Sequence, residues 1–277
     1  MSTDKATSKR LIPLIKSNQP EVKGSASIDL EWIPYKGKYE HSKTKIFAAC
    51  FCTNQGKKIV LHISNFPTER ELVESILYYF NQFPLTFGWY STGVVVYDDN
   101  DPNSRLRGRD SDLFILHQRC QLYGLKSLFE VKKTYVKLID SDRNRKHIDL
   151  HSVFDKQMIQ DGVFERKYRT PSLQNVSQAL LGIGKYGKLN AGTSDVQSLP
   201  LKEQIQYVKR DSELCMLLAQ YNNCLALQIM KVIAKYSEMD YYQVCHTNVS
   251  NWYANLYRKM LESGRCTVAY TPSYKLP

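Results

Sequence analysis

The sequence has little of what marks membrane or secreted proteins. No apolar run approaches the ~20 residues that a membrane-spanning helix needs. The N-terminal stretch MSTDKATSKR lacks the apolar core of a secretion signal. Hydrophobic residues make up 43% of the chain and charged residues 23%, which is typical of a globular domain. The sequence therefore predicts an intracellular protein without a membrane partner.

Cysteine is sparse and forms no metal-binding pattern. The seven cysteines are odd in number and include no C-x-x-C pair. Cys50 and Cys52 lie in the apolar stretch IFAACFCTN, which reads as a strand. We expect reduced, buried thiols rather than a disulfide framework or a zinc site.

Negative charge is in the minority. Lys and Arg number 38 against 27 Asp and Glu, which gives a formal net charge of +11. Such an excess favours a polyanionic partner, and nucleic acid is the commonest one. A basic protein without such a partner remains the alternative.

The first part of the chain predicts strands joined by turns. A polar arm covers residues 1–25, and strand-like stretches follow at 27–34, 43–54 and 57–66. Short polar segments separate these stretches, so we expect an antiparallel meander.

Helices are expected after residue 66. Thr68 and Glu71 form a capping box before a helical pattern of apolar residues. After strand-like residues 85–97, Asp112 opens an amphipathic helix over DLFILHQRCQLYGL. Shorter strands follow around 135–139 and 147–150, and then one long helix runs from about Pro200 through the 230s. The order predicts an α/β fold with a mixed sheet and a C-terminal helical extension.

Two acidic residues stand out in the stretch SIDLEW. Ile28, Leu30 and Trp32 alternate with polar residues, as in a strand. Side chains two apart in a strand point the same way, so Asp29 and Glu31 share one face. Two carboxylates held that close repel each other, which indicates a bound cation.

A tyrosine and an aspartate on a later helix are the best candidates to complete a metal site with Asp29 and Glu31. Y-x-x-x-D occurs three times, at Tyr97/Asp101, Tyr207/Asp211 and Tyr236/Asp240. Only Asp211 falls within an apolar helical stripe, where an ionised carboxylate is costly without a partner. The stripe consists of Ile205, Val208, Leu214 and Leu218.

These segments together resemble the exonuclease domain of family B DNA polymerases. SIDLEW, the helix opened by Asp112 and YVKRD (207–211) match that domain in order and spacing, and IDLHSVFDKQMI and YRTPSLQNVSQALLGIGKYGK also resemble it. The similarity covers about residues 25–240. It implies a ribonuclease-H-like sheet of five to six strands and metal-dependent 3′–5′ removal of nucleotides from single-stranded or frayed DNA, as in proofreading. It also implies a location in the cytoplasm or nucleoid.

The resemblance assigns roles residue by residue. Asp29 and Glu31 match the first motif of the domain, Asp112 the second, and Tyr207 with Asp211 the third. The four acids would hold two Mg²⁺ or Mn²⁺ ions, since hard oxygen ligands suit these metals. Tyr207 would orient the attacking water, because a tyrosine pKa near ~10 makes a poor base at neutral pH.

The second motif departs from the family pattern. An Asn and an aromatic residue usually precede the aspartate, as in N-x-x-x-F-D, whereas Ser111 precedes Asp112 after a charged loop. Asp110, Asp98 and Asp99 are alternative ligands. We favour Asp112 because a helix follows it.

Other residues allow both a functional and a structural interpretation. Trp89, Tyr90, Lys185 and Lys188 are expected near DNA, although aromatic residues in a strand are more often core and GIGKYGK can be a simple turn. The alternating residues of HIDLH (147–151) could share a strand face as a metal site, but a structural segment is favoured.

A D-T-D polymerase motif is absent from the sequence. We therefore expect an exonuclease domain at 26–240, a helical extension at 241–277 toward a polymerase palm, and no polymerisation by this chain. A polymerase chain or domain is a possible partner. A catalytically decayed DNA-binding scaffold and an RNA-trimming exonuclease remain alternatives.

Overall fold

A mixed five-stranded sheet is the centre of the fold. The computed structural model describes residues 24–33, 44–93, 111–132, 135–139, 145–186 and 196–264. The strand order is β3-β2-β1-β4-β7, and β5 pairs with β6 in a separate two-stranded sheet. The strands are β1 (Ser25–Ile33), β2 (Lys45–Thr53), β3 (Lys58–His62), β4 (Leu85–Gly88), β5 (Phe129–Val131), β6 (Val136–Leu138) and β7 (Lys146–Asp149).

The predicted meander is confirmed. β1 pairs antiparallel with β2, and β2 antiparallel with β3. β4 and β7 extend the sheet in parallel with β1. Because the carboxyl ends of parallel strands meet at one edge of a sheet, the residues after Gly88 and Asp149 come close together.

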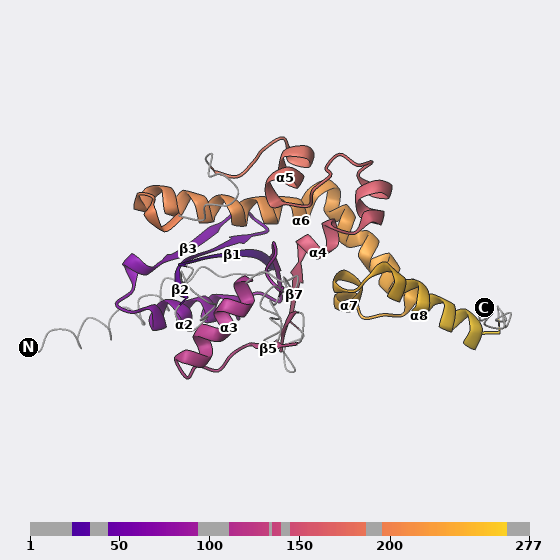
Figure 1. Ribbon diagram of the computed structural model, residues 1–277, viewed down its shortest axis with the longest axis horizontal. Helices are drawn as coiled ribbons and strands as arrows, with labels where there is room; N and C mark the ends of the chain where they lie inside the picture. The colour runs from indigo at the N-terminus through magenta and orange to yellow at the C-terminus, as the bar shows by residue number, and fades with distance from the viewer. Residues whose placement is uncertain are drawn as a thin grey trace, which may run out of the picture.

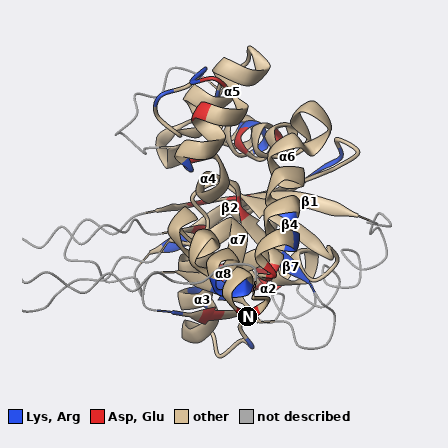
Figure 2. Cartoon of the chain, turned by 90° about the vertical axis from the view of Figure 1, so that its right-hand side faces the viewer, with Lys and Arg blue, Asp and Glu red and all other residues tan. Residues whose placement is uncertain are grey.

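Helices cover both faces of the sheet. α6 lies along one face with α5 beside it, and α2 and α3 cover the other face (Figure 1 and Figure 2). The predicted cap of α2 is present, since the Thr68 side chain accepts a hydrogen bond from the Glu71 amide. The α-helices are α2 (Glu69–Phe80), α3 (Asp112–Leu122), α4 (Leu150–Phe154), α5 (Leu173–Leu181), α6 (Leu201–Ser237), α7 (Tyr241–His246) and α8 (Val249–Glu262), and shorter helical turns are η2 (Ile63–Asn65), η3 (Ile159–Val163) and η4 (Val196–Ser198). The fold class expected from the sequence is confirmed.

The period of β1 separates its apolar and polar faces. Ile28 and Leu30 are buried in the core formed with α2 and α3. Ser27, on the opposite face, donates a 2.6 Å hydrogen bond to the backbone oxygen of Ser212 in α6. Since Asp29 and Glu31 share the face of Ser27, the acidic pair lies under α6.

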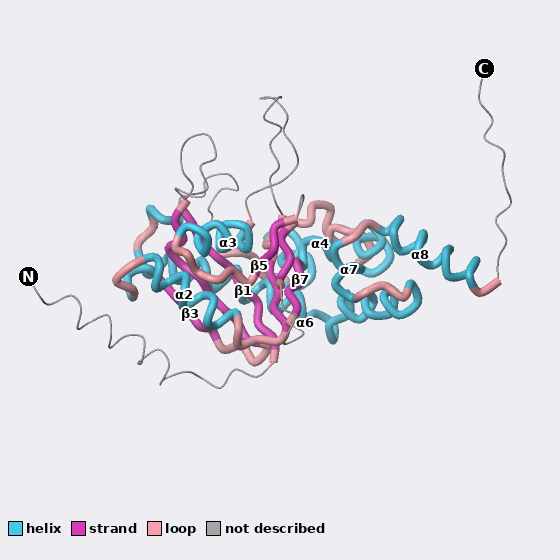
Figure 3. Tube along the Cα trace, turned by 90° about the horizontal axis from the view of Figure 1, so that it is seen from below, coloured by secondary structure: helices cyan, strands magenta, loops and turns pink. Residues whose placement is uncertain are grey.

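The long C-terminal helix is interrupted, which corrects the expectation of one continuous helix. Residues 221–224 leave helical geometry, with φ of 48° at Asn222, 55° at Asn223 and 60° at Cys224. The section before this break carries Tyr207 and Asp211. The section after it leads to α7 and α8, which lie beyond the sheet at one end of the molecule (Figure 3). The expected domain boundary at residue 240 stays a prediction.

The cysteines, the last helix and the polar arm complete the description of the fold. The cysteines at 50, 52, 120, 215, 224 and 245 are free thiols, and five of these six are buried. In α8, Trp252 is buried while Tyr253 and Tyr257 are exposed, as an amphipathic helix requires. Among the described residues, no helix combines the length and apolar character needed to cross a membrane. The polar arm at 1–25 lies almost wholly outside the described residues.

Candidate metal centre

Three predicted acids converge between β1 and α6. Asp29 and Glu31 come from β1, and Asp211 comes from the helix above it; one ligand oxygen of each lies within 4.8 Å of the others. The contact of Ser27 with Ser212 fixes α6 on the strand beside Asp211. A β-bulge follows directly after Glu31, a feature that often re-aims side chains next to active sites.

Asp112 borders this cluster as the first residue of α3. It is 6% exposed, and the backbone amide of Leu30 hydrogen-bonds its carboxyl group. Asp29 and Asp211 are close enough to raise its pKa, although Asp112 is not within the 4.8 Å group. Asp112, at the start of α3, therefore lies beside the three acids, and its role as a metal ligand stays a prediction.

The four carboxyl groups disfavour each other's ionisation. Burial raises the pKa of Asp29 well above its ordinary value, and the charges of Asp211 and Glu31 add to this effect. Burial and Asp211 likewise raise the pKa of Glu31. Burial followed by the charge of Asp29 raises the pKa of Asp112, and burial raises the pKa of Asp211. Such a cluster binds a cation favourably, because a positive charge relieves the repulsion.

Three carboxylate oxygens of the cluster are enclosed and lack a hydrogen-bond partner among the described residues. They are Asp29 Oδ2, Asp112 Oδ2 and Asp211 Oδ1. A buried acceptor without a donor is costly, and a metal ion would satisfy it. A set made only of carboxylates suits Mg²⁺ or Mn²⁺ rather than zinc or copper. The residues present therefore fit the metal implied by the sequence.

Lys185 supplies a cation from the protein itself. Its ammonium group forms an ion pair with Asp211 Oδ2 and lies 5.0 Å from the centre of the Tyr207 ring. Burial works to lower the pKa of Lys185, but Asp211 and Tyr207 outweigh it and raise the pKa above its usual value. The sequence suggested a DNA contact for this lysine, and the structure adds a direct contact with the acidic cluster.

Two hydrogen bonds hold the turn that carries Lys185 in place. The Lys185 amide donates a 2.6 Å hydrogen bond to Gln174 Oε1, and Arg210 Nε donates a 2.9 Å bond to the carbonyl of Gly184. A Cβ atom at Gly184 would lie 2.5 Å from Gln174 Nε2, so a larger residue would displace that side chain. The contacts hold the turn where Lys185 can reach Asp211.

Tyr207 stays protonated beside the cluster. Burial, followed by the charge of Asp211, raises the pKa of its hydroxyl to about 12. At neutral pH the hydroxyl is therefore a hydrogen-bond donor rather than a base.

Trp89 and Tyr90 follow β4 at the carboxyl edge of the sheet. Trp89 lies partly buried against Phe154, with ring centroids 5.6 Å apart. Tyr90 is 43% exposed and its ring centroid lies 3.8 Å from that of His151. Tyr90 remains a candidate base contact, whereas Trp89 packs as a core residue. Lys188 lies outside the described residues.

Side chains of the segment HIDLH (147–151) form hydrogen bonds with β4 and the loop that follows it. His147 contacts the hydroxyl groups of Thr86 and Ser91, and the Asp149 carboxylate accepts hydrogen bonds from four donors. Within the described residues, the three alternating side chains do not form a metal-ligand group. These hydrogen bonds support the structural role favoured from the sequence.

Among the described residues, the competing pair Tyr236/Asp240 lies away from the acidic cluster. Asp240 caps α7 and pairs with Lys146, and Tyr236 is 68% exposed. The alternatives Asp98, Asp99 and Asp110, and the pair Tyr97/Asp101, lie outside the described residues.

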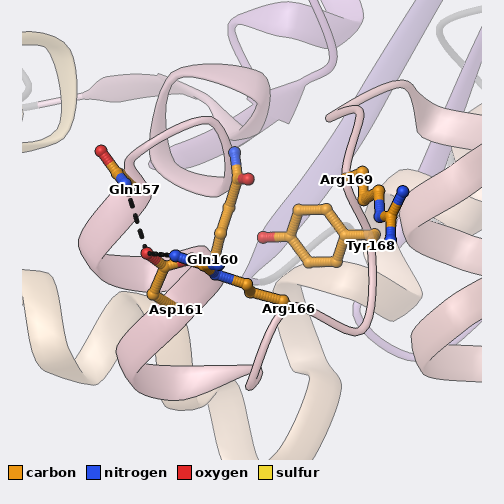
Figure 4. A pocket seen from close by; sticks show the side chains of 6 residues that line it. All are labelled: Gln157, Gln160, Asp161, Arg166, Tyr168 and Arg169. Carbon is orange, nitrogen blue, oxygen red and sulfur yellow. Dashed lines mark hydrogen bonds and ion pairs between the residues drawn. The ribbon is translucent and has the colours of Figure 1, made fainter.

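A cavity of about 570 Å³ opens after α4, and Figure 4 shows the side chains that line it. Arg166 crosses it to pair with Asp161, and Tyr168 forms part of its wall. Of the predicted site residues that the structure describes, none lines it. The lining residues are Gln157, Gln160, Asp161, Arg166, Tyr168 and Arg169.

The sequence relatives of this chain are DNA polymerases. No family model matches the chain. The chain is 26% identical to DNA polymerase 1 of Sulfolobus acidocaldarius and 29% identical to DNA polymerase 1 of Sulfurisphaera ohwakuensis, in each case over 89% of this chain and 28% of the relative. It is 31% identical to DNA polymerase 1 of Aeropyrum pernix over 54% of this chain and 15% of that protein.

The structure is similar to the family B DNA polymerase of Pyrobaculum calidifontis. The TM-score is 0.63 at 16% identity, and the match covers 90% of this chain and 31% of that polymerase. The chain thus spans less than a third of the length of these proteins. The sequence relatives are thus DNA polymerases, and the fold is similar to part of a family B DNA polymerase, in agreement with the exonuclease-domain fold expected from the sequence.

Proposed function

We propose that this chain is a metal-dependent 3′–5′ exonuclease that acts on single-stranded or frayed DNA. The observation that supports it best is the convergence of Asp29, Glu31 and Asp211, with Asp112 beside them. Asp29, Asp112 and Asp211 each have an enclosed oxygen without a partner among the described residues, and the pKa values of all four carboxyl groups are raised. A fold does not gain stability from such a cluster. It gains the ability to hold divalent cations next to a phosphate.

Each residue has a role that follows from its position. Asp29, Glu31, Asp112 and Asp211 would hold two Mg²⁺ or Mn²⁺ ions, and when bound these ions stabilise the charges that develop on a phosphodiester during hydrolysis. The protonated hydroxyl of Tyr207 donates a hydrogen bond to the attacking water and orients it. Lys185 balances the charge of Asp211 before metal binds and can then turn toward the DNA phosphate.

The relatives suggest the setting of this activity. They are DNA polymerases, and this chain corresponds to less than a third of each. We propose that residues 26–240 form the exonuclease unit and that residues 241–277 lead toward a polymerase palm, as a domain or as a separate chain. The activity would then serve proofreading during replication in the cytoplasm or nucleoid.

The proposal is tested with a 5′-labelled single-stranded DNA oligonucleotide. With Mg²⁺ or Mn²⁺ we expect a ladder that shortens from the 3′ end, and with chelator we expect none. A matched RNA oligonucleotide should be cut more slowly. Intact DNA with either metal would contradict the exonuclease, and preferred cleavage of the RNA would favour the RNA-trimming alternative.

Replacing Tyr207 with Phe should reduce turnover without weakening metal binding. The change removes only the hydroxyl that orients the water, so kcat should fall by roughly 100-fold, the size of effect that misplacement of a reactant by about 1 Å can have. The Mn²⁺ concentration for half-maximal activity should not change. Because the Tyr207 pKa is about 12, wild-type activity should show no loss from this group up to pH 9.

A further inference from the structure

We propose that Asp149 of β7 is a positioning residue for Asp112. It fixes the loop of residues 90–92, and this loop holds the first turn of α3. The significance of Asp112 rests on the proposed exonuclease function, but the positioning itself can be measured without catalysis.

The Asp149 side chain is 3% exposed, and both of its carboxylate oxygens accept hydrogen bonds from the loop. Oδ1 accepts hydrogen bonds from the amides of Tyr90 at 2.9 Å and His151 at 3.1 Å. Oδ2 accepts from the amide and the hydroxyl of Thr92, each at 3.0 Å. Three of these four donors belong to the loop of residues 90–92, whereas the His151 amide is the bond by which Asp149 caps α4. Hydrogen bonds to a carboxylate are stronger than those between neutral groups, so the three bonds hold the loop against β7.

The loop then caps α3. The carbonyl of Ser91 accepts a 3.0 Å hydrogen bond from the amide of Leu113, the residue after Asp112. Ser111 occupies the N-cap position, but its side chain makes no cap bond and its hydroxyl has no partner among the described residues. The carbonyl of Ser91 thus performs the task that a capping side chain performs in most helices.

A second contact from β7 holds the same loop. His147 Nε2 lies 2.8 Å from the hydroxyl of Ser91, and its Nδ1 lies 2.9 Å from the hydroxyl of Thr86. Burial lowers the pKa of His147 to about 3, so the ring stays neutral. The approach is tight, since a Cβ atom at Gly88 would lie 2.3 Å from Ser91 Oγ.

The backbone of the loop needs such support. Tyr90 has a φ of 59°, a left-handed conformation that costs a residue other than glycine roughly 1–3 kcal/mol. The bonds from Tyr90 and Thr92 to Asp149 maintain this turn. The second motif of this chain lacks the usual Asn and aromatic residue before its aspartate, and the β7 contacts place Asp112 by another route.

The test compares Asp149→Asn with Asp155→Asn. Asn is nearly the same size, but its NH₂ group meets the Thr92 amide, so the loop loses an anchor. Asp155 is an exposed carboxyl at the end of α4 and serves as the charge-matched control. We measure hydrogen exchange of the Leu113 amide and the affinity for Mn²⁺, with circular dichroism to verify the fold.

In Asp149→Asn, exchange of the Leu113 amide should be at least about tenfold faster, and the Mn²⁺ dissociation constant should rise by roughly tenfold, as for other residues that support metal ligands. Asp155→Asn should match wild type in both. Thr92→Val, which removes one of the four donors, should give a smaller change in the same direction and keeps the test valid if Asp149→Asn does not fold.

Unchanged Leu113 exchange and Mn²⁺ affinity in folded Asp149→Asn would overturn the positioning role. If Leu113 exchange rises but wild-type protein does not cleave DNA, the positioning role stands and the exonuclease proposal fails. If wild-type protein cleaves DNA and Asp149→Asn cleaves it with unchanged metal dependence, the exonuclease stands and the positioning role fails.

Discussion

Asp29→Asn should abolish nuclease activity while DNA binding persists. Asp29 is central to the cluster, within reach of both Glu31 and Asp211, and it also raises the pKa of Asp112. Neutralising it removes a ligand at the point where the cations would sit. We expect kcat to fall by at least about 10³-fold, which corresponds to roughly 4 kcal/mol of transition-state stabilisation.

Glu213→Gln is the matched control for this loss. Glu213 belongs to the second D-x-E sequence, Asp211-Ser-Glu213, but it pairs with Lys58 and Arg210 outside the cluster. Its replacement should change kcat less than about threefold, as expected for a partly exposed ion pair. Equal activity in Asp29→Asn and wild type would show that the acids of SIDLEW do not participate in cleavage.

Raising the pH should destabilise the metal-free wild-type protein, whereas binding of a divalent cation should stabilise it. The folded-state pKa values of the four acids are raised, so folding favours their protonated forms. The metal-free protein is therefore most stable with these groups protonated and loses stability as pH rises from about 4 through the raised pKa values. A divalent cation at neutral pH should restore this stability.

The expected sizes can be measured by thermal unfolding at pH 5 and pH 7.5. Mn²⁺ at a hundred times its dissociation constant should stabilise wild type by about 2.7 kcal/mol at pH 7.5, which is roughly 5–10 °C in Tm, and by less at pH 5. Without metal, Asp29→Asn should unfold at a higher temperature than wild type at pH 7.5 and should gain little from Mn²⁺. A metal-free variant less stable than wild type at pH 7.5 would contradict the raised carboxyl pKa values.

Local patterns predicted much of the fold. The alternation in SIDLEW placed Asp29 and Glu31 on one face, and the capping sequence at Thr68 located the start of α2. The apolar stripe around Asp211 indicated that this carboxylate faces the interior, where it is 3% exposed. These features depend on residues near each other in the chain, which is why the sequence carries them.

Contacts between distant segments were harder to predict. Nothing local indicates that Lys185 reaches Asp211, because the ion pair depends on how the turn after α5 is fastened by Gln174 and Arg210. The support that Asp149 gives to the loop after β4 likewise depends on parallel pairing of β4 with β7.

The break in α6 did leave a signal. Asn222 and Asn223 adopt positive φ, and asparagine tolerates this conformation better than most residues. The apolar pattern on both sides of the pair hid the interruption, since it continues with helical spacing.

Diffraction from crystals grown with Mn²⁺ would test the account most directly, through the anomalous scattering of the metal. We predict a peak between the carboxylates of Asp29, Glu31 and Asp211, with the Lys185 ammonium displaced from Asp211. A peak elsewhere, or no peak with the Lys185–Asp211 ion pair intact, would contradict the assignment of these acids as a metal centre.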